Sequence, residues 1–125
     1  MSDLAEYGLR VRTEIAHARL LAAVHEHVLQ MSTCEASSAD ETVRLSRTLM
    51  SLSQRLKLMS VLKARVVYEA PWEEVASALG MDVVTARKVY GDAEARWLNG
   101  DLAPWEVHGA PVLPLLRRRG RRRQA

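Results

Sequence analysis

The sequence predicts an all-α protein, and three observations lead to that expectation. Apolar residues recur every three to four positions along most of the chain, which is the spacing of one helix face. Hydrophobic residues make up 48% of the 125 residues, with only six glycines, four prolines and no phenylalanine. A chain of this length forms one domain, or one domain with an extension, around a modest core. The expected order is a long N-terminal helix, a second long or bent helix, a trihelical core and a disordered basic C-terminal arm.

The first predicted helix covers residues 3–31, where Gly8 is the only weak helix former. At ~1.5 Å per residue it would be roughly 42 Å long, which is long for so small a domain. Such a helix needs partners: it either mediates dimerisation, with small residues 18, 22 and 23 permitting close approach, or serves as a core helix within one chain. One apolar stripe has helical spacing, and a second set widens it toward the C-terminal half: Leu4, Val11, Ile15, Ala18, Ala22 and Leu29, then Leu20, Leu21, Val24, Val28 and Met31.

The polar stretch 32–40 is the expected loop, and a second helical pattern runs from about Asp40, capped by Asp40 or Ser38, to Ala70. Serines at 51, 53 and 60 leave open whether this pattern is one bent helix or two helices with a break near 53–60. The part that begins at Leu56 is expected to support the next two helices.

Residues 71–90 contain signals for two short helices joined by a tight turn. Pro71 suits a first helical position, Gly80 suits a left-handed helix end, and Asp82 suits an N-cap. Ala76 and Gly80 provide small residues where the helices cross. We expect the second helix to bury Met81, Ala86 and Val89 and to direct five residues outward: Val83, Val84, Thr85, Arg87 and Lys88.

The motif Trp72-Glu-Glu-Val-Ala-x-x-Leu-Gly-Met81, followed by Thr85-Ala-Arg87, resembles the helix-turn-helix of region 4 in sigma factors. It is equally similar to small actinobacterial regulators with a Trp-x-x-Ile/Val-Ala-x-x-Leu-Gly core. The resemblance covers residues 55–98 and implies DNA binding, with the second helix in the major groove. Nothing in the chain resembles the sigma region that melts promoters. The chain departs from the family at Asp82, where Ser or Thr is usual, and in the apolar Val83 and Val84.

The candidate contacts to DNA divide into two groups. Thr85, Arg87 and Lys88 are the base-edge candidates, and Val84 can touch thymine methyl groups. The alternative is a helical hairpin that only packs, with its basic residues solvated. The phosphate candidates are two arginines of the folded part and six of the tail: Arg65, Arg96, Arg117, Arg118, Arg119, Arg121, Arg122 and Arg123.

The periodic pattern extends the second short helix to about Asn99, and Gly100 ends it. Prolines at 104, 111 and 114 then disfavour both a regular helix and a winged hairpin. The arginine run 117–123 is expected to be a disordered arm that lies along phosphates or enters a minor groove. Alternatively, this run binds RNA or anionic lipid, or it contributes only to solubility.

The net charge of +3 is unevenly distributed. Residues 1–54, the expected dimerisation region, have five arginines against seven acids. Residues 55–100, the expected helix-turn-helix domain, have seven basic residues against six acids, and the extension 101–125 has six arginines against two acids. Because phosphate neutralisation supplies most non-specific affinity, the tail is expected to add what the folded part lacks.

Other chemistries lack support in the sequence. Cys34 is the single cysteine, so an internal disulfide and a cysteine-based zinc site are excluded. His25 and His27 would point to different sides of a helix, and Glu14 with His17 would give only two metal ligands. We expect no metal, no cofactor and no catalytic residues, and therefore no enzyme. The aromatic residues are expected in the core: Tyr68, Trp72, Tyr90, Trp97 and Trp105.

The sequence therefore predicts a bacterial, sequence-specific DNA-binding transcription regulator that acts as a homodimer on double-stranded DNA. A two-fold dimer would have half-sites ~34 Å apart, or a multiple of that distance. The alternatives are a module that docks on a sigma factor, an RNA polymerase subunit or another regulator, and a nucleoid-associated non-specific DNA binder. With no long apolar run and no leader, a cytoplasmic location at the nucleoid is expected, without membrane contact.

Overall fold

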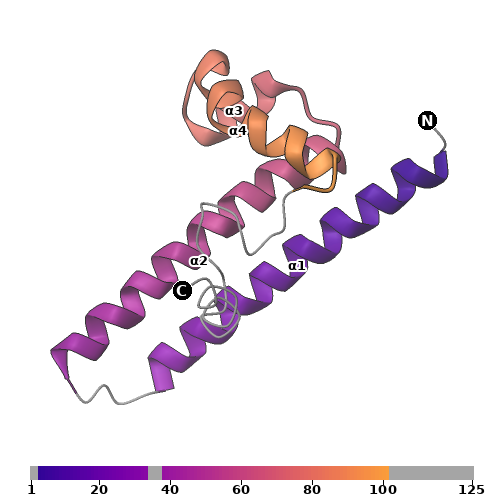
Figure 1. The fold of residues 1–125 in the computed structure, drawn as a ribbon. Helices are drawn as coiled ribbons and strands as arrows, with labels where there is room; N and C mark the ends of the chain where they lie inside the picture. The colour runs from indigo at the N-terminus through magenta and orange to yellow at the C-terminus, as the bar shows by residue number, and fades with distance from the viewer. Residues whose placement is uncertain (1–2, 34–37, 102–125) are drawn as a thin grey trace, which may run out of the picture.

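In the computed structural model, residues 3–33 and 38–101 are described, and they contain four helices and no strand. Helices α1 (Asp3–Thr33) and α2 (Ala39–Val66) run antiparallel as a long hairpin (Figure 1). The short α3 (Trp72–Leu79) and α4 (Val83–Leu98) pack at the C-terminal end of α2 (Figure 1). The all-α prediction is confirmed for these residues.

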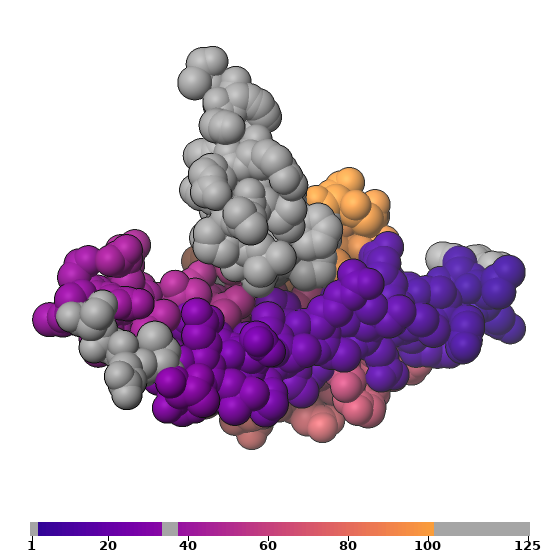
Figure 2. All heavy atoms as spheres, turned by 90° about the horizontal axis from the view of Figure 1, so that it is seen from below, coloured from indigo at the N-terminus to yellow at the C-terminus, as the bar shows by residue number. Residues whose placement is uncertain are grey.

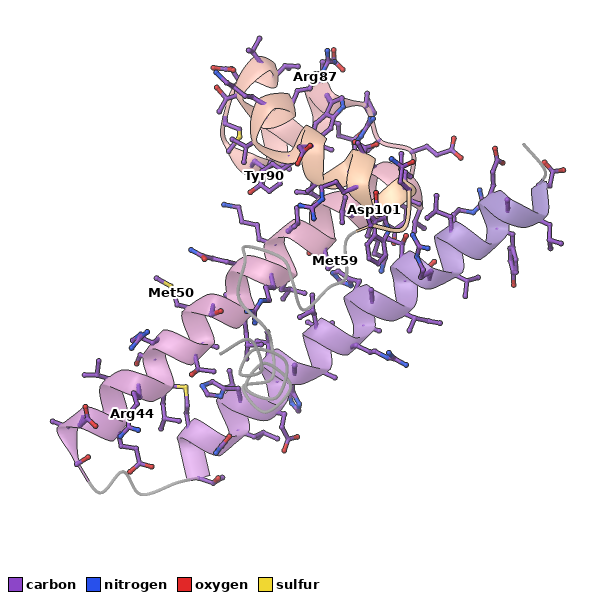
Figure 3. All side chains as sticks on the ribbon, in the orientation of Figure 1. Arg44, Met50, Met59, Arg87, Tyr90 and Asp101 are labelled. Carbon is purple, nitrogen blue, oxygen red and sulfur yellow. The ribbon has the colours of Figure 1, made fainter. Side chains whose placement is uncertain are left out.

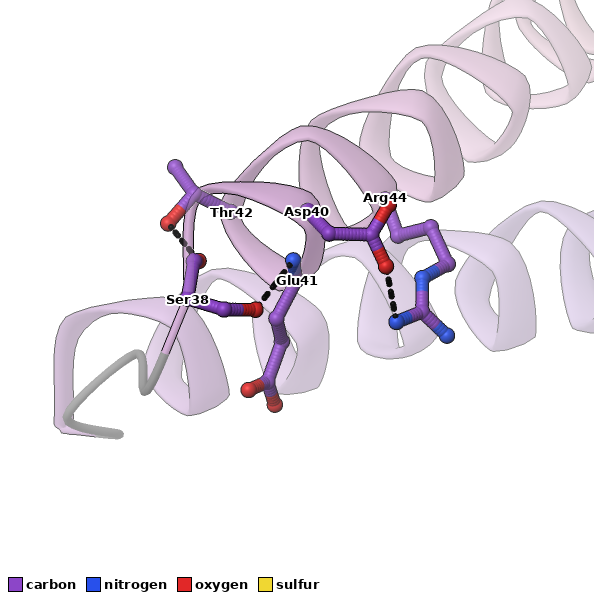
Figure 4. A network of polar contacts seen from close by, with 5 residues as sticks. All are labelled: Ser38, Asp40, Glu41, Thr42 and Arg44. Carbon is purple, nitrogen blue, oxygen red and sulfur yellow. Dashed lines mark hydrogen bonds and ion pairs between the residues drawn. The ribbon is translucent and has the colours of Figure 1, made fainter.

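Helix α2 begins with a compact set of polar contacts (Figure 4). The hydroxyl of Ser38 accepts the backbone N–H of Glu41 at 3.1 Å, which satisfies a donor that the helix itself leaves free. Thr42 donates its hydroxyl to the carbonyl of Ser38 at 3.1 Å, and Arg44 pairs with Asp40 at 2.6 Å (Figure 4). Of the two caps that the sequence allowed, Ser38 is the one used.

The 40–70 pattern contains one helix, because α2 continues without a break through residues 53–60, but this helix ends at Val66 and not at Ala70. Its inner side includes buried Leu52, Met59 and Leu62, together with Arg55, which is only 1% exposed. Burial lowers the pKa of the Arg55 guanidinium, since the charged form is penalised away from water. The helix crosses residues 54–55, where the sequence suggested a domain boundary, and that division stays a prediction.

One apolar cluster joins all four helices. Trp72, Tyr90 and Trp97 belong to it, as the sequence predicted, whereas Trp105 lies outside the described residues. The prediction for Tyr68 is wrong: it is 68% exposed, because it follows the end of α2 and its ring lies beside Lys63 and not against the cluster. The fully or largely buried members are Ala16, Leu20, Leu58, Met59, Val61, Leu62, Ala70, Trp72, Val75, Ala76, Ala86, Tyr90 and Trp97.

Helix α1 presents a different face to the core from the apolar stripe that the sequence singled out. Thr13, Ala16, Leu20 and His27 are its buried residues, and the His27 Nε2–H donates to the Leu45 carbonyl at 2.8 Å. The first predicted stripe lies on the opposite side and is exposed: Leu4 is 78% exposed, Val11 37%, Ile15 48% and Leu29 47%. Of the second set, Leu20 is buried in the core. Thus α1 is a core helix on one side and has an uncovered apolar surface on the other.

Trp97 connects the end of α4 to α1. Its Nε1–H donates to the hydroxyl of Thr13 at 2.9 Å, and its backbone carbonyl accepts from Arg12 at 2.7 Å. The Arg12 guanidinium also lies over the Trp97 ring, 4.6 Å from the ring centroid. The Thr13 hydroxyl in turn donates to the carbonyl of Leu9 at 2.7 Å, so the indole N–H, the Thr13 hydroxyl and the Trp97 carbonyl each have a partner.

Thr13→Val is expected to destabilise the fold by about 1–3 kcal/mol, because it leaves the buried indole N–H of Trp97 without an acceptor. Thr13→Ser keeps the hydroxyl and should lose much less. Thr33→Val, at an exposed hydroxyl on the same helix, is the control. Urea unfolding followed by circular dichroism measures all three; equal stabilities for Thr13→Val and Thr13→Ser would contradict the role of this hydrogen bond.

Candidate functional site

The turn between α3 and α4 is three residues long and is determined locally. Gly80 ends α3 in the left-handed region with φ 75°, where a residue with a side chain would be strained. The N–H of Met81 returns to the carbonyl of Ala76 at 3.0 Å, and that of Gly80 to the carbonyl of Ser77 at 3.2 Å. Pro71 caps α3 from an extended conformation with ψ 160°, one residue before the helical position that the sequence predicted.

Asp82 starts α4 as its N-cap, as predicted. Its carboxylate accepts the backbone N–H of Thr85 at 2.7 Å, and its backbone carbonyl accepts from Ala86 at 3.0 Å. The hydrogen bond from the Thr85 N–H is the main reason that the pKa of Asp82 lies below its usual range. The cap therefore carries a negative charge at the exposed start of α4.

Two alanines allow α3 and α4 to approach closely. Ala76 is 1% exposed and Ala86 is 0% exposed, and both lie in the common core. Trp72 and Val75 pack from α3, while Tyr90 packs from α4. The short helices are thus held as one unit on the end of α2.

The first two turns of α4 present an outward surface of mixed character. Val84 is 75% exposed, and Thr85, Arg87 and Lys88 are exposed as well. Arg87 points away from the α1–α2 hairpin, whereas Tyr90 lies on the side toward α2 (Figure 3). The structure thus leaves Val84 and the three base-edge candidates exposed on the first two turns of α4.

Two of the orientations predicted for this segment are wrong. Val89 is 54% exposed, not buried, because the inner line of α4 runs through Ala86, Tyr90 and Trp97 and leaves residue 89 to its side. Val83 is partly buried and packs against the core, so it does not face outward. Met81 packs there too, as expected.

Arg65 lies in an internal cluster and not on the outward surface of α4. Its Nε and Nη2 donate to the two carboxylate oxygens of Glu94 at 3.0 and 3.2 Å, and its Nη1 donates to the Ala70 carbonyl at 2.9 Å. The guanidinium also lies 4.5 Å from the centre of the Trp72 ring. These contacts occupy the donors that a phosphate would need, so we leave Arg65 out of the candidate surface.

The other phosphate candidates are Arg96 and the six arginines of the tail. Arg96 is exposed near the end of α4. The six tail arginines, Arg117 to Arg123 without Gly120, lie outside the described residues.

Asp92 is among the six acids of residues 55–100, but the sequence did not place it at the candidate surface. It is exposed, and it follows Lys88 by four residues, which places the two on the same side of α4. With Glu73, Glu74, Asp82 and Glu94, it gives residues 71–98 five acids against three basic residues, a net charge of −2. Residues 84, 88 and 92 are four positions apart, and this helical spacing in the sequence could have shown that Asp92 lies on the same side of α4 as Val84 and Lys88. The α3–α4 unit therefore has a weaker electrostatic attraction to phosphates than the 55–100 total suggested.

The described residues contain no cluster of three or more side chains suited to a metal ion. His27 is buried against Leu45, while His25 is exposed. His17 donates or accepts at the Ser60 hydroxyl at 3.0 Å; burial, and then the charge of Lys63, lowers the pKa of its imidazole. None of the helices in the described ranges is long and apolar enough to span a membrane.

Comparison with protein-family models, with curated proteins and with solved structures found no match to this chain.

Arg65→Lys is expected to destabilise the fold by about 2 kcal/mol, although the positive charge is retained, because a lysine cannot pair with both carboxylate oxygens of Glu94 and stack on Trp72. Chemical denaturation measures the loss. Arg44→Lys, in an exposed pair with Asp40, is the control and should change little. Equal effects at the two positions would mean that the Arg65 cluster adds no stability.

Asp82→Ala is expected to lower the melting temperature by a few degrees at neutral pH, because the Thr85 N–H loses its acceptor. Asp82→Asn keeps an oxygen acceptor and should lose less. Since the pKa of Asp82 is lowered on folding, its carboxylate stabilises the fold above the unfolded value near 3.8 and loses this effect as the pH falls further. Thermal scans should therefore show the Ala variant approaching wild type in acid; a constant difference would argue against the ionised cap.

Proposed function

We propose that this chain is a double-stranded DNA-binding transcription regulator that acts as a dimer, with α3 and α4 as a helix-turn-helix. The observation that carries the proposal is the exposed group Val84, Thr85, Arg87 and Lys88 on the first two turns of α4. In a helix-turn-helix, the N-terminal part of the second helix contacts base edges in the major groove. A three-residue turn joins α3 to α4, and the buried residues of both helices pack in the common core behind this group.

Each residue of the group has a suitable partner in the groove. Arg87 can donate two hydrogen bonds to a guanine, Thr85 and Lys88 can donate to base acceptors, and Val84 can contact a thymine methyl group. Arg96 and the tail arginines would contact phosphates. Because the net charge of residues 71–98 is −2, we assign most of the non-specific affinity to the tail.

Selection from a random duplex pool, followed by fluorescence anisotropy, tests the proposal. Arg87→Ala should lose about 1–3 kcal/mol of discrimination at one base pair, or roughly 10- to 100-fold. Arg44→Ala is the matched control, since Arg44 is also exposed but lies at the far end of α2 (Figure 3). If both variants bind the selected site like wild type, α4 does not contact its bases.

Removal of residues 117–125 separates affinity from specificity. The salt slope of binding should fall by about 5, since six phosphate contacts each contribute about 0.9. The preference for the selected sequence over random duplex should remain. A shortened chain that loses the preference itself would place specificity in the tail.

A second candidate function is docking on another protein, such as a sigma factor, an RNA polymerase subunit or another regulator. The observation in its favour is the acidic balance of α3 and α4 together with the exposed Val84 and Val89. Apolar side chains beside scattered charges are common in protein interfaces. If no duplex sequence is enriched from the pool, this candidate is the better account of the same surface.

A further inference from the structure

The exposed side of α1 has the spacing of a coiled-coil seam. Eight positions follow one another at alternating steps of four and three residues, all of them exposed: Leu4, Gly8, Val11, Ile15, Ala18, Ala22, His25 and Leu29. This is an unbroken seven-residue repeat, which keeps one stripe facing a partner helix when two helices supercoil. The buried residues of α1, such as Thr13, Leu20 and His27, lie on the opposite side of the helix.

The apolar exposure of α1 is concentrated on this stripe. Leu4, Val11, Ile15 and Leu29 belong to it, and the other large exposed apolar residues of the helix flank one edge: Tyr7 at 60%, Leu21 at 51% and Val28 at 45%. Figure 2 shows α1 along the length of one face of the molecule. From residue 4 to 29 the stripe is ~38 Å long, and with a width of about 10 Å it covers roughly 400 Å². Apolar patches of this size on a monomer often mark an interaction site.

We propose that this stripe binds the same stripe of a second copy of the chain, with the two α1 helices antiparallel. The evidence for a second copy is the order of large and small residues. In the register where the numbers of facing residues add to 33, Ile15 faces Ala18 of the second copy and Val11 faces Ala22. Leu4 then faces Leu29, and Gly8 faces His25.

In this register, each inner layer combines a larger with a smaller side chain, so the separation of the helices stays even along the seam. A parallel pair would instead place alanine on alanine at 18 and 22, and histidine on histidine at 25. Such alternation of empty and crowded layers packs poorly.

Gly8 supports the same register. A Cβ added at this position would meet nothing within 4 Å in the single chain, and glycine is a poor residue for the middle of an exposed helix. Opposite His25 of a second copy, the missing side chain makes room for the imidazole. Along the flank, Tyr7 would lie beside Val28 of the other copy, which buries two further exposed apolar residues.

This inference specifies the dimer that the proposed function assumes, but its test needs no DNA. The full chain should show a concentration-dependent monomer–dimer equilibrium in sedimentation experiments. Ile15→Glu should shift it strongly to monomer with the circular dichroism spectrum unchanged, because it places a charge in the seam. Gln30→Glu, an exposed site off the seam, is the matched control. A monomeric wild-type chain, or equal dimerisation of Ile15→Glu, would overturn the interface.

Disulfide cross-linking tests the direction, in a Cys34→Ser background that removes the native thiol. A mixture of Leu4→Cys and Leu29→Cys chains should cross-link to each other, whereas each alone should stay uncross-linked, because residues 4 of two antiparallel copies lie ~38 Å apart. Cross-linking of each variant only with itself would show a parallel pair and refute the proposed register. If removal of residues 102–125 is needed before any dimer forms, the stripe in the full chain is not a dimer interface.

Sequence-specific DNA binding by a chain that stays monomeric would overturn this inference and leave the proposed α4 contacts intact. A dimer with the predicted cross-link but no DNA binding would support the α1 interface and overturn the proposed function in DNA binding.

Discussion

The structure depends on one junction, at which Trp97 joins the end of α4 to α1. The indole N–H, the ring face and the backbone carbonyl of this residue all contact Thr13 or Arg12. Since Trp97 is 2% exposed, these polar groups are satisfied within the protein and not by water. The α3–α4 unit is thereby held against the hairpin from one end, while Arg65 and Glu94 hold it from α2.

This arrangement relates the two surfaces of interest. The exposed side of α4 faces away from the hairpin, and the uncovered stripe of α1 lies on the side of α1 opposite its core contacts. Because both rest on the same core cluster, the position of each α4 in a proposed α1 dimer would be set by packed helices and not by a flexible linker. A fixed separation of two such helices is what a pseudo-palindromic site would require.

Much of the fold was predictable from residues 3–98, and the exceptions have physical causes. The helices, the Gly80 turn and the Asp82 cap follow from local sequence, and the structure has all of them. Which side chains face the core was harder to predict. Val89 and Tyr68 are apolar or aromatic residues at plausible core positions, yet both are exposed because the core contacts are made by neighbouring residues. Arg65 looked like a phosphate contact because its partner Glu94 lies 29 residues away along the chain.

The sequence alone determined most helix ends, because capping, left-handed glycine and apolar spacing act within a few residues, although it did not show that α2 ends at Val66. It also determined the alternation of large and small residues along the outer stripe of α1. Only the tertiary structure decided which of two apolar faces of α1 packs on α2, and that Arg65 pairs inside while Arg87 and Lys88 remain at the surface. Those choices depend on contacts between residues far apart in the chain. The free energies of such contacts cannot be inferred from a local sequence pattern.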